Sequence, residues 1–313
     1  MPQVSVILPT FNRVQYLRAA VDSVFAQTYA DWELVIADDG SDEETRRYLR
    51  SLASSRVRTL LLPHRGNPSL VRNAALRAAH GRYLAFLDSD DLWAPMKLAR
   101  QIDALGGGAK GGWSYTACDL IDASGRLLAL DSRSTAGPTG WIFEAVLRLQ
   151  VSISMATVVA ERELIEAIGA FDEQQLFAEW QDLCLRLALR SEAVALPEVL
   201  CSVRLHAEHY SGDRVAAQLG WMRLYEKMVP LAPSAVLRSY CERMRAESSL
   251  NVASCQGAQG DYRAVLNTLA TSLRYGWRYP HWWWGAAKRV VRPAVPAFLR
   301  ERLRRARSEI PSR

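Results

Sequence analysis

The stretch YLAFLDSDDLW, Tyr83 to Trp93, decides the fold because its apolar run ends abruptly in carboxylates. Asp88, Asp90 and Asp91 lie within four residues of one another. Carboxylates this close repel each other and raise one another's pKa unless a positive charge offsets them. Taken alone, the stretch fits either a solvated acidic turn or a site that holds a metal cation.

Outward from this stretch, apolar runs alternate with segments of helical periodicity over the first hundred residues. We predict strands at 4–9, 32–38, 57–62 and 83–88, and helices at 16–27, 41–53 and 69–81, with Ser41 and Glu44 as a capping box. Continuous apolar strands between helices indicate an α/β fold whose mostly parallel sheet is covered by helices on both faces.

The polar residues fall where such a sheet binds its ligand, which is beyond the carboxyl ends of the strands. The first strand leads into Pro9–Asn12, the second into Asp38–Ser41 and the fourth into Asp88–Asp91. Unrelated solvated turns would not need this coincidence. The position therefore favours a metal site at Asp88–Asp91, because Mg²⁺ and Mn²⁺ prefer oxygen ligands and often bind one or two carboxylates with substrate phosphates.

After residue 105 the pattern changes. Extended segments are predicted at 113–122, 127–131, 154–161 and 193–206, with helices at 141–149 and 179–190, and helices follow from about Val215. We therefore predict one domain over 1–212, divided into a donor-binding half at 1–105 and an acceptor or catalytic half at 106–212. A helical region with a Trp-rich basic tail is predicted over 213–313.

The composition narrows the class of protein. Five scattered cysteines without a CxxC pair indicate reduced thiols, and no apolar run reaches the length of a membrane span. We therefore predict a cytoplasmic location, at the inner face of the membrane if the tail binds lipid. Residues 285–313 hold nine Lys or Arg and two Glu, a net charge of +7. The whole chain carries +6, so the residues before this segment are together nearly neutral. With no recognised nucleic-acid module, we expect no nucleic-acid partner.

The ordered motifs VSVILPTFNR, WELVIADDGSDEET and RNAALRAAHGRYLAFLDSDDLWAP resemble the nucleotide-binding half of non-processive, bacterial-type family-2 glycosyltransferases, which have the GT-A fold. The resemblance is dense over the first hundred residues and thinner to about Ser211. It implies transfer of one sugar, usually with inversion, from a nucleoside diphosphate sugar to an acceptor hydroxyl. It also implies Mn²⁺ or Mg²⁺ as cofactor. Uridine diphosphate is the favoured nucleotide, and a glycan or lipid-linked molecule of the cell surface is the favoured acceptor.

The same resemblance implies roles for individual residues. The expected nucleotide-sugar ligands are Pro9, Thr10, Phe11, Asp38, Asp39, Arg72, Asp88 and Ser89. Among them, Thr10, Phe11 and Asp39 would line the nucleobase pocket, Asp88 would lie near the ribose and Arg72 near the diphosphate. Asp90 would bind the metal. His206, in a segment similar to the family's R-x-H motif, would approach the diphosphate or the metal.

The general base is where this sequence departs from the family pattern, which often has Glu-Asp before a D-L-x-L-R segment. Here Trp180 follows Glu179, and Asp182 begins the segment DLCLR. Glu179 and Asp182 are three residues apart and would share a helical face. Either could act as the base, with a slight preference for Asp182, and loss of the base is the third possibility.

Three functions therefore stay open at this point: a glycosyltransferase, a sugar-nucleotide-binding protein with weakened catalysis, and a nucleotidyltransferase. The last is disfavoured because PTFNRVQYL contains no Gly-rich phosphate loop. Separately, WRYPHWWWGAAKRVVR combines four tryptophans with basic residues. Trp favours membrane interfaces and cations attract anionic headgroups, so we expect peripheral membrane contact through this tail, against the alternative that the tryptophans pack on the body.

Overall fold

The computed structural model describes residues 2–52, 54–106, 111–130, 137–206 and 213–294. Within them the chain forms two compact units, Met1–Tyr210 and Ser211–Arg313, which we call the sheet unit and the helical unit. The subdivision of the first predicted domain into donor and acceptor halves stays a prediction.

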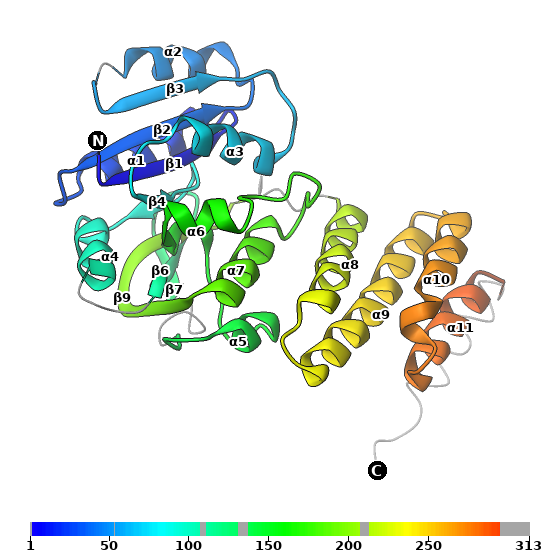
Figure 1. The fold of residues 1–313 in the computed structure, drawn as a ribbon. Coiled ribbons are helices and arrows are strands. Elements are labelled where there is room, and N and C mark those ends of the chain that lie inside the picture. The colour runs from blue at the N-terminus through cyan, green and yellow to red at the C-terminus, as the bar shows by residue number, and fades with distance from the viewer. Residues whose placement is uncertain (1, 53, 107–110, 131–136, 207–212, 295–313) are drawn as a thin grey trace. The chain divides into compact units, whose positions relative to one another are not determined.

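The N-terminal half of the sheet unit is a succession of parallel strands and helices (Figure 1). Its elements are β1 (Val4–Thr10), α1 (Val14–Phe25), β2 (Trp32–Asp38), α2 (Glu43–Ser51), β3 (Val57–Leu61), α3 (Pro68–Ala78) and β4 (Tyr83–Phe86). Strand β1 pairs in parallel with both β2 and β4, and β2 pairs in parallel with β3.

The second half extends the same sheet and adds antiparallel pairs. Its elements are β5 (Leu92–Trp93), α4 (Lys97–Gly106), β6 (Gly111–Ile121), β7 (Leu127–Leu130), α5 (Phe143–Leu147), the 3₁₀ helix Met155–Thr157, β8 (Val159–Glu161), α6 (Arg162–Ala167), α7 (Glu179–Arg190) and β9 (Glu192–Arg204). The strand order is β3-β2-β1-β4-β8-β6-β9-β5, with β7 on β6. The long β6–β9 ladder is again parallel. The predicted α/β fold with a mostly parallel sheet is confirmed.

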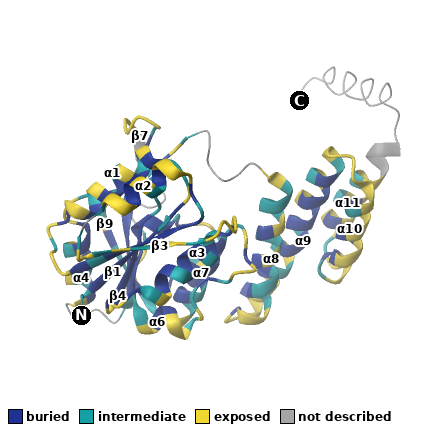
Figure 2. Cartoon of the chain, turned by 90° about the horizontal axis from the view of Figure 1, so that it is seen from above, coloured by how far each residue is buried: buried dark blue, intermediate teal, exposed yellow. Residues whose placement is uncertain are grey.

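Both faces of the sheet are covered, which explains why its strands read as unbroken apolar runs. Figure 2 shows α1 and α2 on one side of the sheet and α3, α6 and α7 on the other. Val4, Val6 and Leu8 alternate along β1 and pack in the cluster that includes Leu17 and Val21 of α1. The side chains between them, Ser5 and Ile7, are equally buried.

One local prediction is wrong. The start of α2 is capped by Asp42, whose carboxylate accepts a hydrogen bond from the Thr45 backbone N–H, and not by a Ser41–Glu44 capping box. Ser41 Oγ instead accepts from the Asn12 N–H at 2.7 Å and so ties the end of β2 to the end of β1. The residue that looked like a cap therefore joins two strand ends.

The helical unit consists of α8 (Arg214–Leu231), α9 (Ala235–Ala258), α10 (Tyr262–Gly276) and α11 (Pro280–Ala294). Its core is built around Trp282, with Leu250, Val265 and Leu269 among its neighbours. The predicted helical C-terminal region is confirmed for the described residues. None of the described helices is long and apolar enough to cross a membrane.

Candidate active site

The carboxyl ends of β1, β2 and β4 meet at one edge of the sheet. Thr10 pairs with Asp38 across β1 and β2, and Ile7 pairs with Phe86 across β1 and β4. The Asp39 N–H donates to the Thr10 carbonyl at 2.9 Å. The parallel register thus brings together the three polar segments that follow these strands, as the strand-end rule predicts.

An aromatic and acidic corner follows β1 and β2. The Phe11 ring is 43% exposed and stacks on His64 with ring centroids 4.3 Å apart. The Asp39 carboxylate accepts from the backbone N–H groups of Arg65 and Gly66 at 2.8 and 2.9 Å, and its Oδ2 lies 3.0 Å from His64 Nδ1. An exposed ring beside a fixed carboxylate is suited to stacking and hydrogen bonding with a planar base.

Thr10, Pro9 and Asp38 are less accessible than Phe11. Thr10 is buried and Pro9 half-buried. Asp38 is completely buried, accepts from the Ser41 N–H at 3.2 Å and lies 3.6 Å from Arg46 Nε. In this structure Asp38 holds the turn after β2, and Asp39 is the carboxylate nearer the surface.

Arg72 of α3 joins two carboxylates from distant parts of the chain. Its Nη2 donates to Asp88 Oδ1 at 2.6 Å and its Nη1 to Glu179 Oε1 at 3.0 Å. Burial lowers the pKa of Arg72, but the charges of Asp88 and Glu179 more than offset this effect, so the net shift is upward. The guanidinium is therefore a permanent charge that fixes the strand-end loop against the start of α7. Its predicted contact with a donor stays a prediction.

Asp90 is in contact with side chains from two other parts of the sheet unit. Its Oδ2 lies 2.9 Å from His206 Nε2 and 3.4 Å from Arg13 Nη1. His206 is brought there by the end of β9, where Arg204 donates its backbone N–H to Asp91 Oδ1 and its Nε to the Asp90 carbonyl. The His206 ring also stacks on Tyr16, with centroids 5.1 Å apart.

Negative charge is crowded in this loop. Asp91 is buried, and burial together with the charges of Asp90 and Asp88 raises its pKa well above the ordinary value. Ser89, between them in the sequence, is half-buried. A carboxyl group with a raised pKa among neighbouring acids is typical of functional sites, including sites that bind a cation.

Glu179 and Asp182, the two candidate bases, have different surroundings one turn apart on α7. Glu179 contacts Arg72 at the strand-end loop, whereas Asp182 is completely buried and ion-paired with Arg186 at 2.6 Å. Arg186 also donates to the Ile168 carbonyl, away from the loop. The two carboxylates therefore share a helical face but not an environment: Glu179 lies at the strand-end loop, and Asp182 pairs within its own helix.

The backbone around these residues is unusual. Asn12 and Arg13 both have φ near +60°, as does Ala178 directly before Glu179. Non-glycine residues rarely adopt this left-handed conformation, and such strain gathers at ligand-binding segments. The strained turns point Arg13 toward Asp90 and begin α7 with Glu179 in its first turn.

Sequence reasoning did not select Arg13, Tyr16 or His64. His64 follows β3, so the rule applied to the other three strand ends would have found it. Arg13 and Tyr16 carried no comparable signal, because their proximity to Asp90 and His206 depends on how the start of α1 is placed.

Within the part of the chain that the structure describes, two side chains are placed to contribute to a metal site. The described residues contain no cluster of three or more His, Cys, Asp or Glu arranged to bind a metal. Asp90 and His206 supply two potential ligands 2.9 Å apart. In an octahedral Mg²⁺ site with bonds of about 2.1 Å, adjacent ligands are separated by about 3 Å, so this pair fits two neighbouring positions.

A cavity of about 430 Å³ lies at the other edge of the sheet unit, near the amino ends of β1 and β4. Its lining includes Gln3, Arg82 and Glu161 and none of the predicted site residues. The strand-end site is thus distinct from this cavity.

Comparison with known proteins gives an independent view of the same residues. A family model described as glycosyl transferase family 2 matches residues 5–116. The chain is 41% identical over 102 residues, 33% of its length, to the Escherichia coli UDP-Glc:alpha-D-GlcNAc-diphosphoundecaprenol beta-1,3-glucosyltransferase WfgD, of which this match covers 40%. It is 30% identical to the putative teichuronic acid biosynthesis glycosyltransferase TuaG of Bacillus subtilis, over 70% of this chain and 86% of that protein.

Solved structures extend the likeness to the fold. S. aureus TarS 1-349 in complex with UDP-GlcNAc aligns with a TM-score of 0.65 at 18% identity, covering 87% of this chain and 81% of that one. The mannosyltransferase PcManGT from Pyrobaculum calidifontis, in complex with GDP-Man and Mn²⁺, aligns with a TM-score of 0.57 at 18% identity, covering 93% and 87%. These alignments confirm the predicted GT-A-type architecture with a helical extension.

Proposed function

The chain belongs to glycosyltransferase family 2, and on this premise we propose that it transfers one sugar from a nucleoside diphosphate sugar to an acceptor hydroxyl, with inversion. The observation that carries the proposal is the bridge from Asp88 through Arg72 to Glu179. It joins the acidic loop after β4 to the start of α7, which supports a donor site and a candidate base at one edge of the sheet.

We propose that the donor's base lies against Phe11 and hydrogen-bonds Asp39, with Thr10 and Pro9 beside it and Asp38 supporting the turn. Asp88 and Ser89 would face the ribose and the diphosphate. Neighbouring structures were solved with UDP-GlcNAc and with GDP-Man, which supports a nucleotide-sugar donor. Uridine diphosphate is the nucleotide we favour, since WfgD is named for UDP-Glc.

The cofactor we propose is Mn²⁺ or Mg²⁺, held by Asp90 and His206. When bound, such an ion would stabilise the negative charge that develops on the leaving diphosphate. Two side chains position these candidate metal ligands. Arg204 fixes the loop backbone at Asp90, and Tyr16 orients the His206 ring. Arg13 adds a positive charge near Asp90 that would also face a diphosphate.

Glu179 is the general base in this proposal. Its carboxylate would accept the acceptor's hydroxyl proton as the oxygen attacks the sugar's anomeric carbon and the diphosphate leaves. Arg72 holds Glu179 Oε1 through a buried, charge-assisted hydrogen bond, which keeps the carboxylate oriented while its other oxygen serves the acceptor. Asp182 would support α7 through Arg186 rather than take part in the reaction.

For the acceptor, we propose a cell-surface glycan or a lipid-linked precursor of one. TuaG is named for teichuronic acid biosynthesis, and WfgD for a diphosphoundecaprenol-linked acceptor. One name refers to a glycan polymer and the other to a lipid-linked sugar, which supports this class of acceptor without selecting one member.

The test is a thermal-shift panel of nucleoside diphosphate sugars with and without Mn²⁺. A ligand at about 100 times its dissociation constant stabilises the folded state by about 2.7 kcal/mol. We expect a Mn²⁺-dependent shift for a uridine diphosphate sugar, its loss in Asp90→Ala, and its retention in the control Asp103→Ala on the exposed face of α4. Failure of every donor to stabilise the wild type would contradict the proposal.

A second candidate, a sugar-nucleotide-binding protein without turnover, is favoured by Trp180 following Glu179 and by the burial of Asp182. Donor hydrolysis, followed as release of the nucleoside diphosphate, separates the two. Turnover lost in Glu179→Gln with donor binding intact would support the enzyme. Donor binding with no turnover in the wild type, whatever acceptor is added, would support the binding protein.

A further inference from the structure

Three of the four tryptophans near the C-terminus are on the surface of the helical unit, and the fourth is in its core. Trp277, Trp283 and Trp284 are 57%, 49% and 66% exposed, whereas Trp282 is 1% exposed. The predicted cluster is therefore divided between two functions, because one indole anchors α11 and three face outward. Exposed indoles in such number on one short segment are unusual for a soluble surface.

The anchoring explains why the other indoles cannot turn inward. Trp282 and Ala286, one helical turn apart, face the core, and the Trp282 Nε1–H donates to Ser249 Oγ at 3.0 Å. Gly276 makes room for this ring, since a Cβ there would collide with the indole. With Trp282 fixed, the geometry of α11 directs Trp284 and Lys288 to the opposite side of the helix, while Trp283 lies at its flank with its ring edge-to-face against the Trp282 ring.

Two cations accompany the exposed rings. Arg278 Cζ lies 5.0 Å from the Trp277 ring centroid, and Lys288 Nζ lies 5.2 Å from that of Trp284. The Trp283 Nε1–H donates to the Trp277 carbonyl at 3.1 Å, which holds the turn between α10 and α11 beside the first turn of α11. We call Trp277, Arg278, Trp283, Trp284 and Lys288 the tryptophan face.

The chemistry of this face identifies one partner. Indoles prefer the boundary between hydrocarbon and headgroups, and Lys or Arg beside them are attracted to lipid phosphates. The sequence adds six arginines and two glutamates over 295–313, a further net charge of +4 on the same segment of chain. A bilayer surface rich in anionic phospholipid satisfies both the apolar rings and the cations.

We propose that the tryptophan face docks the protein onto an anionic phospholipid bilayer, with Trp277 and Trp284 entering the headgroup boundary and Arg278 and Lys288 contacting phosphates. The inference is independent of the reaction proposed above. It rests on side chains of the helical unit alone.

The test is flotation of the full chain with vesicles of phosphatidylcholine, with and without phosphatidylglycerol. We expect binding to the anionic vesicles and a fall in partition coefficient of at least about tenfold in W277A/W284A, equivalent to about 1.4 kcal/mol. Trp141→Ala is the matched control, because that indole is 65% exposed on the sheet unit, and it should bind as the wild type does. Arg278→Ala and Lys288→Ala should each weaken binding about fivefold. The effect of each substitution should become smaller as the salt concentration rises, because salt screens the attraction to lipid phosphates.

A second readout separates docking by the tryptophan face from attraction by the basic tail alone. Brominated lipids quench indoles that enter the bilayer, so wild-type emission should fall on binding and W277A/W284A should lose most of that quenching. Circular dichroism would establish that the variant is folded. Absence of wild-type binding to anionic vesicles would overturn the proposal, and so would equal binding and quenching in W277A/W284A.

Discussion

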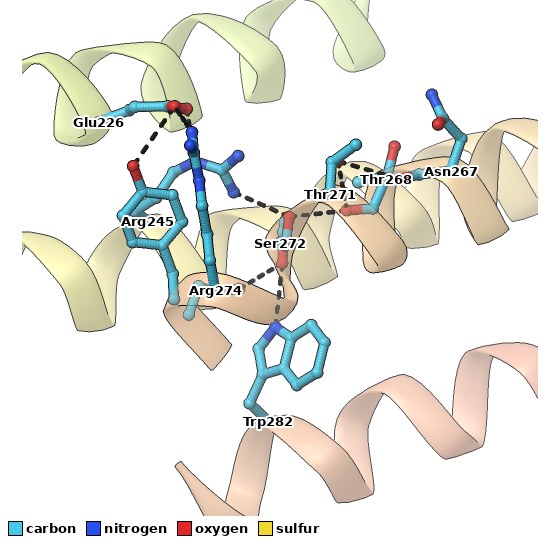
Figure 3. A network of polar contacts seen from close by, with 11 residues as sticks. Glu226, Arg245, Asn267, Thr268, Thr271, Ser272, Arg274 and Trp282 are labelled. Carbon is cyan, nitrogen blue, oxygen red and sulfur yellow. Dashed lines mark hydrogen bonds and ion pairs between the residues drawn. The ribbon is translucent and has the colours of Figure 1, made fainter. Parts of the chain in front are cut away.

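Each unit of this protein contains a buried arginine within a polar network, but the two networks are opposite in balance. At the sheet edge one arginine, Arg72, is shared by two carboxylates, Asp88 and Glu179. In the helical unit one carboxylate, Glu226, is shared by two arginines, Arg245 and Arg274 (Figure 3). The network around Arg72 therefore has an excess of negative charge, whereas the network around Glu226 has none.

The surroundings enlarge this difference. Asp90 and Asp91 add further acids beside Asp88, and the pKa of Asp91 is raised by burial and by its neighbours. In the helical unit, Arg245 also donates to Ser272 Oγ at 2.9 Å and lies over the Tyr275 ring. A network with satisfied charges serves stability, whereas one with surplus acids suits a site that binds a cation. Four predictions test this contrast.

The largest effect is expected from Glu179→Gln. Removal of a general base lowers kcat by about 10²–10⁴-fold. Because glutamine can still accept the hydrogen bond from Arg72, and Asp88 remains as an ionised partner of the guanidinium, stability and donor affinity should change little. Steady-state release of the nucleoside diphosphate measures kcat, and thermal shift measures donor binding.

Asp182→Asn is the control for that variant. It should lower the melting temperature, since buried Arg186 loses its ionised partner, while the folded fraction keeps its kcat. If Asp182→Asn instead abolished turnover in a fully stable protein and Glu179→Gln did not, the assignment of the base would be reversed.

Arg72→Met should give the next largest effect. It leaves two carboxylates together without their cation, and breaking a buried pair of this kind costs about 3–5 kcal/mol. Arg72→Lys keeps the charge but cannot bridge both acids in the same way, so its free energy of unfolding should lie between those of the wild type and Arg72→Met. Urea denaturation gives the free energies of unfolding, and a stable Arg72→Met would show that the bridge contributes little.

Arg245→Met should have a smaller effect. Glu226 keeps Arg274, so the loss is one charged hydrogen bond and the contact with Ser272, about 1.5–3 kcal/mol. The kcat of the folded protein should not change. Arg243→Met, which removes an exposed pair with Glu247, is the control and should cost under about 1 kcal/mol. An equal loss of unfolding free energy in Arg245→Met and Arg243→Met would contradict the view that the buried network stabilises the helical unit more than an exposed ion pair does.

The smallest expected effect is a change in the melting temperature of Glu226→Gln, relative to the wild type, as the pH is lowered. Burial raises the pKa of Glu226, but its hydrogen bond with Arg245 and the charges of Arg245 and Arg274 outweigh this, so the net shift is downward. A carboxyl with a lowered folded pKa contributes stability above its unfolded value and loses it as pH falls through the folded value. The difference in melting temperature between wild type and Glu226→Gln should therefore shrink from pH 7 to pH 3. A difference that is constant with pH would mean that Glu226 contributes through packing.

Much of the sheet edge could be predicted because parallel topology fixes where strand ends lie. An apolar run with no alternation implies a strand covered on both faces, and the residues after such strands must meet at one edge. That reasoning brought Phe11, Asp39, Asp88 and Asp90 together. Applied to β3, it would also have selected His64.

Other contacts could not be predicted, because they join elements through three dimensions. The i, i+4 spacing of Asp182 and Arg186 is a local signal for their ion pair, but nothing local in the sequence shows that Glu179 reaches Arg72, more than 100 residues away in the chain. Likewise, WWW gives no sign that only Trp282 is buried. That choice depends on the rotation of α11 against α9 and α10.

By itself, then, the sequence determined the alternation of strands and helices, the edge at which the polar loops gather, and the basic character of the C-terminal tail. These follow from hydrophobic periodicity and charge, which are properties of neighbouring residues. Only the tertiary structure decided which acid shares Arg72, that Arg13 lies near Asp90 and which indoles face outward. Those outcomes depend on helix rotation and on pairing between distant segments, because packing a close-fitting core selects one arrangement among many that the local pattern allows.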